Sequence, residues 1–302
     1  MRLGAIGLDT SHAPSFAALL NDPKNAHHVA GAKIVTAYPG GSSDIAASAG
    51  RVKGFTAEMR DKWGVEILDD VPSLCARVDA VLLLSVDGRV HLEQVRPVFA
   101  AKRPVFIDKP LAASVADARE IFRLAAAAKV PVFTASALRF SPGILKAKGD
   151  PAVGAILGCE SVGPCSTEPH HPDLFWYGIH GVEILFALMG PGCESVSRTA
   201  TADTDLVVGR WRDGRIGSFR GIRKGSAPFA ATVFGEKSVT RVEPGAGPLY
   251  QPLLEEVVKF LRTGVPPVAA EESLEVLAFM EAADASKREG GKTVALGPLL
   301  GK

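Results

Sequence analysis

The chain has 302 residues, 47% of them hydrophobic and 22% charged, which is typical of a globular protein with one large or two medium domains. Lysine and arginine number 34 against 33 aspartates and glutamates, so the net charge of +1 provides no field that would attract nucleic acid. We expect small-molecule partners instead.

No apolar run reaches the roughly 18 residues that a membrane span needs, and a strand-like segment at Arg2 leaves no room for a signal peptide. The four cysteines are scattered without a C-x-x-C pair, which favours reduced thiols over disulfides or a metal site. The sequence therefore predicts a cytoplasmic protein without membrane contact.

The first part of the chain alternates short apolar runs with helix-like runs. The apolar runs are continuous, as in strands that are covered on both faces, and the alternation predicts right-handed βαβ units in a doubly wound parallel (Rossmann) sheet. Strands are predicted at 2–7, 33–38, 78–85, 104–108 and 130–136, and helices at 13–22, 55–64, 91–102 and 114–129.

The second part mixes strands, hairpins and helices, which predicts an α+β domain with a mixed or antiparallel sheet. We assign residues 1–140 to a dinucleotide-binding Rossmann domain and residues 141–302 to an α+β domain for substrate binding and oligomerisation. Within the latter, strands are predicted at 152–163 and in hairpins at 205–222 and 229–242, and helices at 178–190, 249–264 and 271–290.

The stretch AIGLDTSHAPSF begins like the glycine-rich turn of a dinucleotide site, but only the first of the three glycine positions, Gly7, holds glycine. Asp9 and His12 occupy the other two. A carboxylate 4 Å from one phosphate charge costs roughly 1 kcal/mol in water and about 4 kcal/mol at an effective dielectric constant of 20. Asp9, with Thr10 or Ser11 beside it, caps the helix in a fold that has lost its cofactor; alternatively it points away, and His12 or backbone N–H groups face the diphosphate.

Four segments later in the chain each contain a distinctive short motif. Residues 78–112 end in Asp108-Lys109-Pro110, SALRFSPG begins at Ser136, GDPAVGAILG begins at Gly149, and WYGIHGVEILFALMG begins at Trp176. In this order and spacing they resemble the glucose-fructose oxidoreductase / inositol dehydrogenase (Gfo/Idh/MocA) family over nearly the full length. Its corresponding motifs are Glu-Lys-Pro, Arg-Phe-x-Pro, the entry to the second domain, and the Asp-x-Gly-x-His helix.

The resemblance implies hydride exchange between a nicotinamide cofactor and a hydroxyl-bearing carbon, with Lys109 and His180 as catalytic residues. His180 would be the general base and Lys109 would stabilise the developing alkoxide. Trp176 stands where the family usually has an aspartate, and an indole only donates hydrogen bonds. It is equally open whether Trp176 lines the pocket or packs between domains. The expected substrate-binding residues are Arg139, His171, Asp173, Trp176 and Tyr177.

The nucleotide specificity is predicted from the end of the second strand. NAD enzymes commonly place an acid there, whereas this chain has Tyr38 followed by PGGSSD. Backbone N–H groups in this loop could form an anion-binding nest for a 2′-phosphate, with Arg51 nearby, so NADP is favoured over NAD. The residues of this nest would be Gly40, Gly41, Ser42 and Ser43. The expected cofactor-binding residues are Gly7, Asp9, Ser11, His12, Tyr38, Ser42, Ser43, Ser85, Asp87, Asp108 and Lys109.

These observations predict an NAD(P)-dependent oxidoreductase acting on a small carbohydrate-like substrate. The main alternative is a non-redox member of the family that binds a nucleotide or sugar-like ligand as a sensor, and a lyase or hydrolase is a narrower one. The histidine pair at His170 and His171 lacks a clear third ligand, so no metal site is expected. A homo-oligomer, dimer or tetramer, is expected from the resemblance.

Overall fold

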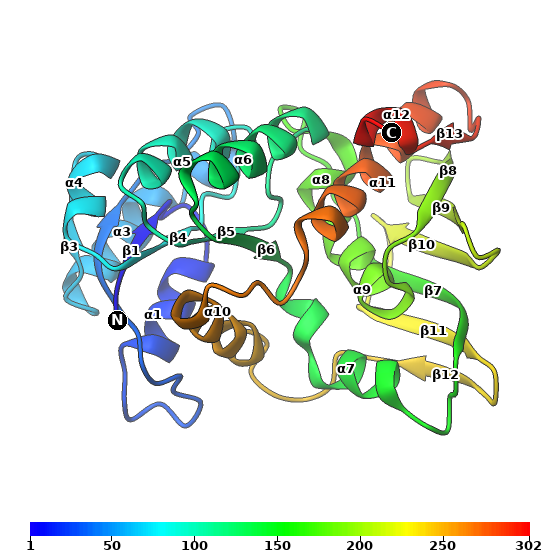
Figure 1. Cartoon of the computed structure of the whole chain (residues 1–302), viewed down its shortest axis with the longest axis horizontal. Coiled ribbons are helices and arrows are strands. Elements are labelled where there is room, and N and C mark those ends of the chain that lie inside the picture. The colour runs from blue at the N-terminus through cyan, green and yellow to red at the C-terminus, as the bar shows by residue number, and fades with distance from the viewer. The chain divides into compact units, whose positions relative to one another are not determined.

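The computed structural model describes all residues, 1–302, and the chain divides into two compact units (Figure 1). The N-terminal unit contains residues 1–113, 117–135 and 248–270, and the C-terminal unit contains residues 114–116, 136–247 and 271–302. The main crossing lies at residue 136. The chain returns to the N-terminal unit for residues 248–270, which the sequence analysis placed in the second domain.

The N-terminal unit is built on a six-stranded sheet in which every pair of neighbours is parallel, so the predicted doubly wound sheet is confirmed. The strand order is β3-β2-β1-β4-β5-β6. The central strands are buried on both faces, as their apolar runs predict. The strands are β1 (Arg2–Ile6), β2 (Lys33–Tyr38), β3 (Glu66–Ile67), β4 (Ala80–Leu83), β5 (Val105–Asp108) and β6 (Val132–Ala135).

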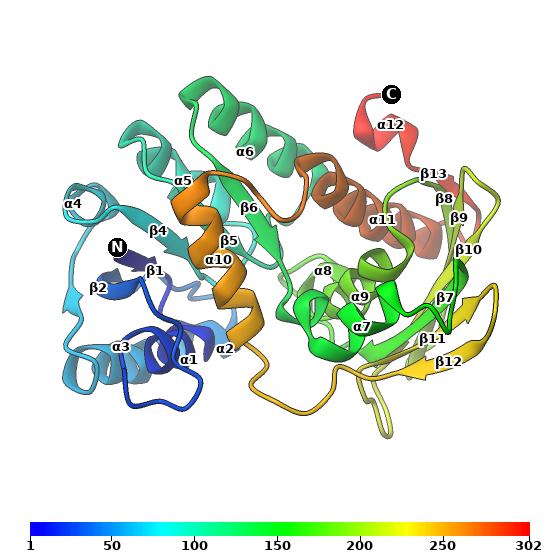
Figure 2. The same cartoon turned by 60° about the horizontal axis from the view of Figure 1, so that its bottom comes forward.

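Helices cover both faces of this sheet: α5 and α6 lie on one face and α1 and α10 on the other (Figures 1 and 2). The connection after β2, which the sequence suggested as a long loop, contains α2 and the start of α3. The helices of this unit are α1 (His12–Leu20), α2 (Ala46–Ala49), α3 (Val52–Asp61), α4 (Val71–Ala76), α5 (His91–Ala100), α6 (Val115–Ala128) and α10 (Gln251–Thr263). The strand order reverses between β1 and β4, and the carboxyl ends of such strands are where α/β sheets bind ligands.

The C-terminal unit contains a seven-stranded mixed sheet in the order β12-β11-β7-β10-β9-β8-β13. Only the pair of β7 and β10 is parallel, and both predicted hairpins, β9 with β10 and β11 with β12, are present as antiparallel pairs. The strands are β7 (Ile156–Pro164), β8 (Cys193–Ala200), β9 (Thr204–Trp211), β10 (Ile216–Ile222), β11 (Ala230–Gly235), β12 (Val239–Val242) and β13 (Val294–Ala295).

Helix α9 (Ile179–Met189) packs against one face of this sheet and approaches it closely at Gly181. A Cβ atom on Gly181 would lie 2.1 Å from the ring of Phe219 on β10, so glycine sets the distance between helix and sheet. This contact fixes the start of α9, which carries His180. The remaining helices of the unit are η1 (Ala137–Phe140), α7 (Pro142–Gly149), α8 (Asp173–Trp176), α11 (Ala270–Arg288) and α12 (Gly297–Leu300).

All four cysteines are buried free thiols, so the structure pairs none of them in a disulfide. None of the helices combines the length and the apolar character that crossing a membrane requires.

Candidate active site

The turn after β1 lies against the end of β4, and Gly7 makes this approach possible. Gly7 has φ +90°, in the region that favours glycine, and a Cβ atom there would lie 2.3 Å from the backbone nitrogen of Ser85. The Ser85 hydroxyl donates to Gln94 Oε1 at 2.8 Å. The first glycine of the predicted dinucleotide turn is therefore required by the backbone itself.

The carboxylate of Asp9 points away from the start of α1. It accepts hydrogen bonds from the Ser48 hydroxyl at 2.6 Å and from the Val86 backbone N–H at 3.1 Å, and the residue is completely buried. Burial raises the pKa of Asp9, although these hydrogen bonds act in the opposite direction. Asp9 thus joins three loops at the carboxyl edge of the sheet, and it does not cap the helix.

The amino terminus of α1 is capped only in part. The Thr10 hydroxyl oxygen accepts the backbone N–H of His12 at 3.3 Å, the first turn of the helix contains no acidic residue, and the backbone N–H groups of Thr10 and Ser11 have no hydrogen-bond partner. Unpaired N–H groups and the positive end of a helix dipole form a site for a phosphate group. The Asp9 carboxylate therefore does not occupy this helix terminus, whereas the Thr10 hydroxyl takes up one of its N–H groups.

The His12 ring leaves this helix terminus and reaches the end of β5, where Nδ1 lies 2.5 Å from Asp108 Oδ2. The rings of Phe16 and Tyr250 flank it, with centroids 5.4 and 4.8 Å away. Asp108 is buried, and burial alone would raise its pKa, but His12 and Lys109 outweigh this effect and the pKa is lowered. Asp108 Oδ1 is buried without a hydrogen-bond partner, so an acceptor is left for a donor group of a ligand.

Lys109 follows Asp108 directly and is also buried, with 8% of its surface exposed. Burial lowers the pKa of its ammonium group, and the neighbouring carboxylate of Asp108 opposes this shift only in part. A lysine in such surroundings gives up and regains a proton far more readily than a solvated one, which suits acid–base chemistry.

The loop after β2 is held at the same edge by hydrogen bonds to its side chains and backbone. The Ser42 hydroxyl donates to Asp87 Oδ2 at 2.6 Å, and the Ser42 backbone N–H donates to the Ser48 hydroxyl at 2.7 Å. Tyr38 ends β2, and its carbonyl oxygen accepts the backbone N–H of Gly7 at 2.9 Å. Ser43 is exposed at the tip of this loop.

Arg89 joins this loop to the end of β4 through two carboxylates. Its guanidinium group donates to Asp87 at 2.8–3.1 Å and to both oxygens of Asp44 at 2.9 Å. Burial would raise the pKa of Asp87, but hydrogen bonds from Arg89 and Ser42 lower it below its usual range. Asp87 is therefore a buried, ionised anchor of the loop.

In the C-terminal unit, His180 lies in the first turn of α9 with its ring held on three sides. Nδ1 lies 2.8 Å from the Ser136 hydroxyl oxygen, and the rings of Tyr177 and Phe229 make edge contacts at centroid distances of 5.1 and 5.7 Å. These contacts orient the imidazole ring.

Arg139 forms buried ion pairs within the same unit. Its Nε donates to Glu183 at 2.5 Å and its Nη1 donates to Glu272, whereas Nη2 is buried without a partner. Burial would lower the pKa of Arg139, but the two glutamates raise it. The substrate-binding role expected for Arg139 would thus depend on Nη2 alone.

Asp173 belongs to a buried ionic cluster. Lys287 donates to it at 2.6 Å and Arg198 at 3.1 Å, and Arg198 also pairs with Asp205 and Asp284. Burial would raise the pKa of Asp173, but the two cations lower it. Both features favour a structural carboxylate over the substrate-binding role that the sequence suggested, for which only Oδ1, buried without a hydrogen-bond partner, is left.

The ring of His171 lies 5.4 Å from that of Trp176, and its Nδ1 lies 3.3 Å from the carbonyl oxygen of Pro172. His170 is exposed beside Glu168. The structure gathers no set of three or more histidine, cysteine, aspartate or glutamate side chains with the geometry of a metal site.

Two residues at these sites were missed by the sequence analysis. Ser136 contacts the catalytic candidate His180, and only its place at the end of a predicted strand hinted at a role. His91 is fully buried, and its ring nitrogens lie 2.8 Å from the carbonyl oxygen of Ser85 and 3.1 Å from that of Leu111. His91 thereby joins the loops after β4 and β5, on which Ser85 and Lys109 lie.

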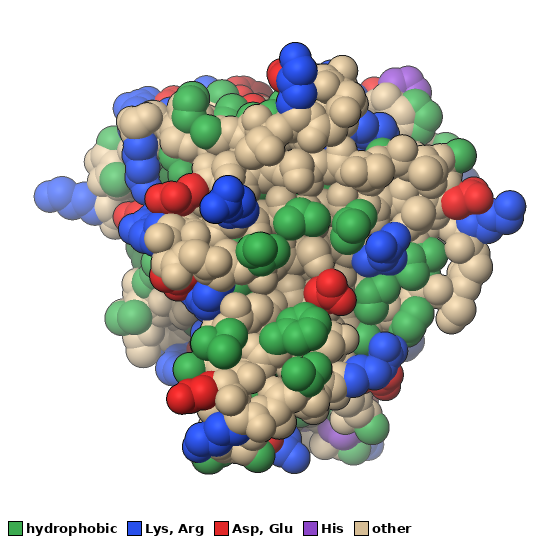
Figure 3. Space-filling model, turned by 90° about the vertical axis from the view of Figure 1, so that its right-hand side faces the viewer, with side chains coloured by type: hydrophobic (Ala, Val, Ile, Leu, Met, Phe, Trp, Pro, Cys, Tyr) green, Lys and Arg blue, Asp and Glu red, His purple; other side chains and the backbone are tan.

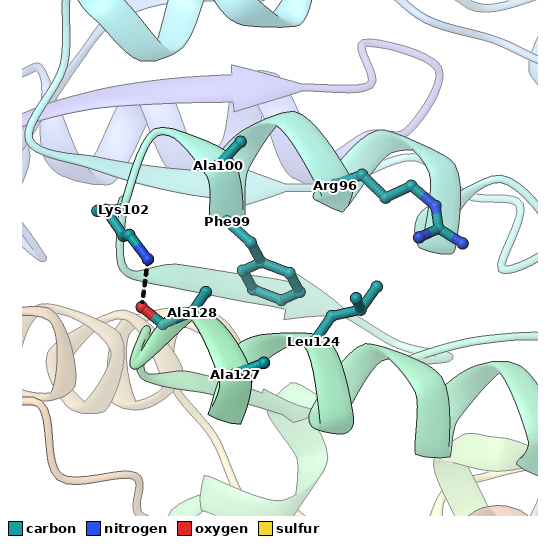
Figure 4. A pocket seen from close by; sticks show the side chains of 7 residues that line it. All are labelled: Arg96, Phe99, Ala100, Lys102, Leu124, Ala127 and Ala128. Carbon is teal, nitrogen blue, oxygen red and sulfur yellow. Dashed lines mark hydrogen bonds between the residues drawn. The ribbon is translucent and has the colours of Figure 1, made fainter.

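A separate groove of about 350 Å³ lies between α5 and α6 (Figure 4). Phe99 forms its floor, and Lys102 Nζ donates to the Ala128 carbonyl oxygen at 2.9 Å. These residues lie at the carboxyl ends of the two helices, hence at the amino edge of the sheet. The groove is therefore remote from the residues described above.

Comparison with known proteins relates the N-terminal part of the chain to an oxidoreductase family. Residues 2–136 match the family model described as "Oxidoreductase family, NAD-binding Rossmann fold", the Gfo/Idh/MocA model. Over these residues the chain is similar to the Gfo/Idh/MocA family. A relative, the myo-inositol 2-dehydrogenase of Thermotoga maritima, is 28% identical over 207 residues, which cover 60% of this chain and 62% of that enzyme.

Solved structures of similar fold cover nearly the full length of this chain. A probable dehydrogenase from Thermotoga maritima has a TM-score of 0.79 and 22% identity, over 99% of this chain and 100% of the other. The myo-inositol dehydrogenase of Lactobacillus casei, in complex with NAD(H) and myo-inositol, has a TM-score of 0.77 and 18% identity, over 98% and 96%. At such identities the likeness establishes the fold.

Proposed function

We propose that the protein is an NAD-dependent dehydrogenase that oxidises a hydroxyl group of a small polyhydroxylated substrate. The observation that carries this proposal is the buried lysine, Lys109, at the carboxyl edge of the sheet whose first helix is preceded by the unpaired N–H groups of Thr10 and Ser11. An ammonium group that is easily deprotonated and a phosphate-binding helix end are the two features that such a reaction needs. The family and the myo-inositol 2-dehydrogenase relative support the same reaction class.

The residues at the carboxyl edge fit a dinucleotide. Gly7 allows the close turn, the N–H groups of Thr10 and Ser11 would hold the diphosphate, and Asp108 Oδ1 would accept a ribose or amide donor. When bound, the nicotinamide supplies the carbon that accepts or returns hydride. Asp9 does not oppose this binding, because its carboxylate is directed at Ser48 and Val86.

NAD is proposed in preference to NADP, which the sequence analysis favoured. The Ser42 hydroxyl expected to bind a 2′-phosphate already donates to Asp87, and Arg89 is neutralised by Asp87 and Asp44. A 2′-phosphate would meet two carboxylates at this loop, whereas a ribose hydroxyl can donate to a carboxylate.

Lys109 and His180 are proposed as the catalytic residues. Lys109 would exchange a proton with the substrate hydroxyl group and stabilise the oxygen as charge develops, and His180 would donate a hydrogen bond to the substrate. Aromatic surface for the apolar face of a sugar-like ring would come from Tyr177, whose ring contacts His180, and from Trp176, whose ring contacts His171.

A titration of purified protein with NADH and NADPH, followed by nicotinamide fluorescence, tests the cofactor assignment. We expect NADH to bind at least about tenfold more tightly than NADPH, and no binding of either below about millimolar concentration would end the proposal. Asp44→Asn should narrow the difference between the two cofactors, because it frees one edge of Arg89. Asp61→Asn, which removes an exposed aspartate paired with its neighbour Arg60, is the matched control.

Turnover is tested by following NADH absorbance with NAD and a panel of polyols and sugars, myo-inositol among them. Activity with at least one polyol supports the proposal. Tight NADH binding without any activity in either direction would instead favour the non-redox sensor that the sequence analysis kept as its alternative.

A homo-oligomer, dimer or tetramer, is proposed to form through the sheet face that α9 leaves uncovered (Figure 3). Ile216 is 56% and Val239 63% exposed, and Glu160 and Arg220 beside them have no ion-pair partner within the chain. A two-fold partner would bury the apolar side chains and pair the charges. Light scattering should show an assembly that Ile216→Glu dissociates, whereas Val265→Glu, at an exposed site in the other unit, leaves it intact. The cytoplasmic location stays a prediction.

A further inference from the structure

The hydroxyl group of Ser136 makes two contacts and is sealed from water. Its oxygen lies 2.8 Å from His180 Nδ1 and accepts the backbone N–H of Leu138 at 3.3 Å. Ser136 has no exposed surface, and no other group accepts its proton. The carboxylate of Glu183 is bonded to the Ser136 backbone N–H and to Arg139.

The direction of the bond between Ser136 and His180 follows from counting donors and acceptors. If His180 Nδ1–H donated to the serine oxygen, that oxygen would accept two hydrogen bonds and its own buried proton would have no acceptor. If the serine hydroxyl donates to Nδ1, both the oxygen and the proton of that hydroxyl have a partner. Leaving a buried donor unpaired costs about 1–3 kcal/mol, which corresponds to a ratio of roughly 5 to 150 between the two arrangements.

We infer that Ser136 holds neutral His180 as the Nε2–H tautomer, so that the imidazole offers its substrate a hydrogen-bond donor and not a basic lone pair. Ser136 is thus a positioning residue that acts through His180. The inference concerns the active site of the proposed dehydrogenase, and its meaning for the reaction rests on that proposed function.

This arrangement explains how the chain functions with Trp176 in place of the family's usual aspartate. A carboxylate accepts Nδ1–H and leaves Nε2 as a base, whereas an indole accepts nothing and a serine hydroxyl can donate. No carboxylate at position 176 competes for Nδ1, and the buried hydroxyl of Ser136 selects the tautomer with hydrogen on Nε2.

A histidine with its hydrogen on Nε2 would not take up the hydroxyl proton of the substrate in the oxidation. That proton would pass to the neutral amine of Lys109, the base of the proposed function, and the nicotinamide, when bound, would supply the hydride acceptor, so that a carbonyl group and an ammonium group result. In the reduction, Lys109 would return the proton to the oxygen.

The tautomer is measured directly by long-range ¹H–¹⁵N correlation spectra of protein labelled with [¹⁵N]histidine, without cofactor, at a pH where His180 is neutral. The His180 signals are assigned by their loss in His180→Gln. We expect a protonated-type shift at Nε2 and an unprotonated-type shift at Nδ1. A protonated Nδ1 in the wild-type protein would overturn the inference.

Two variants separate the effect of the hydroxyl from the intrinsic preference of imidazole. Ser136→Ala should move the averaged nitrogen shifts towards a mixture of tautomers, and Ser136→Thr, which keeps a hydroxyl, should restore the wild-type values. Unchanged shifts in Ser136→Ala would refute the role of the hydroxyl. Because these spectra need no cofactor, they can fail while NADH still binds and reacts, and they can succeed if the proposed dehydrogenase activity is absent.

Discussion

The buried cation Arg198 offers the sharpest test of how the C-terminal unit is held together. Its side chain has no exposed surface and pairs with Asp173, Asp205 and Asp284. In Arg198→Met, Asp173 keeps Lys287 and Asp205 keeps Arg223, whereas Asp284 loses its one ion-pair partner.

The expected loss is therefore that of one unpaired, buried carboxylate, about 3–5 kcal/mol. With a urea dependence of about 2 kcal/mol per molar, the unfolding midpoint should fall by about 2 M. Arg212→Met, which removes an exposed arginine at the turn after β9, should change the unfolding free energy by less than about 0.5 kcal/mol.

Tryptophan fluorescence is a suitable probe, because Trp176 and Trp211 lie in the C-terminal unit and only Trp63 lies in the other. In a Trp63→Phe background the signal reports the C-terminal unit alone. A loss below about 1 kcal/mol in Arg198→Met would refute the reasoning. Adding Asp284→Asn should recover part of the loss, since the unpaired charge is then gone.

The pH dependence has a definite sign. Burial raises the pKa of Asp284 to about 7, and Arg198 opposes the shift, so removing Arg198 raises this pKa further. A carboxyl group whose folded pKa lies above its unfolded value contributes stability below the unfolded pKa, and this is lost as the pH rises through the folded pKa. The deficit of Arg198→Met should thus be larger at about pH 8 than at about pH 6.

Three further substitutions test the site. Gly7→Ala places a Cβ atom 2.3 Å from the Ser85 backbone at φ +90°, so it should lower the unfolding free energy of the N-terminal unit by at least about 2 kcal/mol and abolish NADH binding; a thermal melt and the titration check both. Lys109→Met should reduce kcat by about 10²–10⁴ while the dissociation constant for NADH stays within a few-fold, and unchanged turnover would remove Lys109 from the catalytic residues. Asp173→Asn should lower stability and leave KM within about twofold, because Arg198 and Lys287 hold that carboxylate; a large rise in KM would restore its substrate role.

Much of the fold could be predicted because the relevant signals are local. Continuously apolar runs bounded by turns mark β4 and β5, and the glycine-containing turn at Gly214 marks the hairpin of β9 and β10. The two-residue strand β3 was missed, since it is too short to show any period. The return of α10 to the N-terminal unit was missed because amphipathicity shows that a helix packs, but not against which element.

The sequence predicted which residues belong to the candidate site better than it predicted which side chains they contact. Lys109 could be placed from its position at the end of a strand. The residue before it, Asp108, pairs with His12, and these two residues are 96 positions apart in the sequence. The contact between Ser136 and His180 is equally non-local. Side chains that meet across such distances leave no spacing pattern, so only the three-dimensional structure could identify them.

Asp9, in the turn after β1, was the strongest argument from the sequence against a bound cofactor. The surroundings of its carboxylate reverse that argument. A carboxylate next to a diphosphate is unfavourable only while it is charged and directed at the phosphates. The Asp9 carboxylate is directed at Ser48 and Val86. Burial raises the pKa of this group, which favours its neutral form. The same two hydrogen bonds draw the loops after β2 and β4 together over the turn, so the residue that replaces a glycine fixes the loops that a dinucleotide would contact.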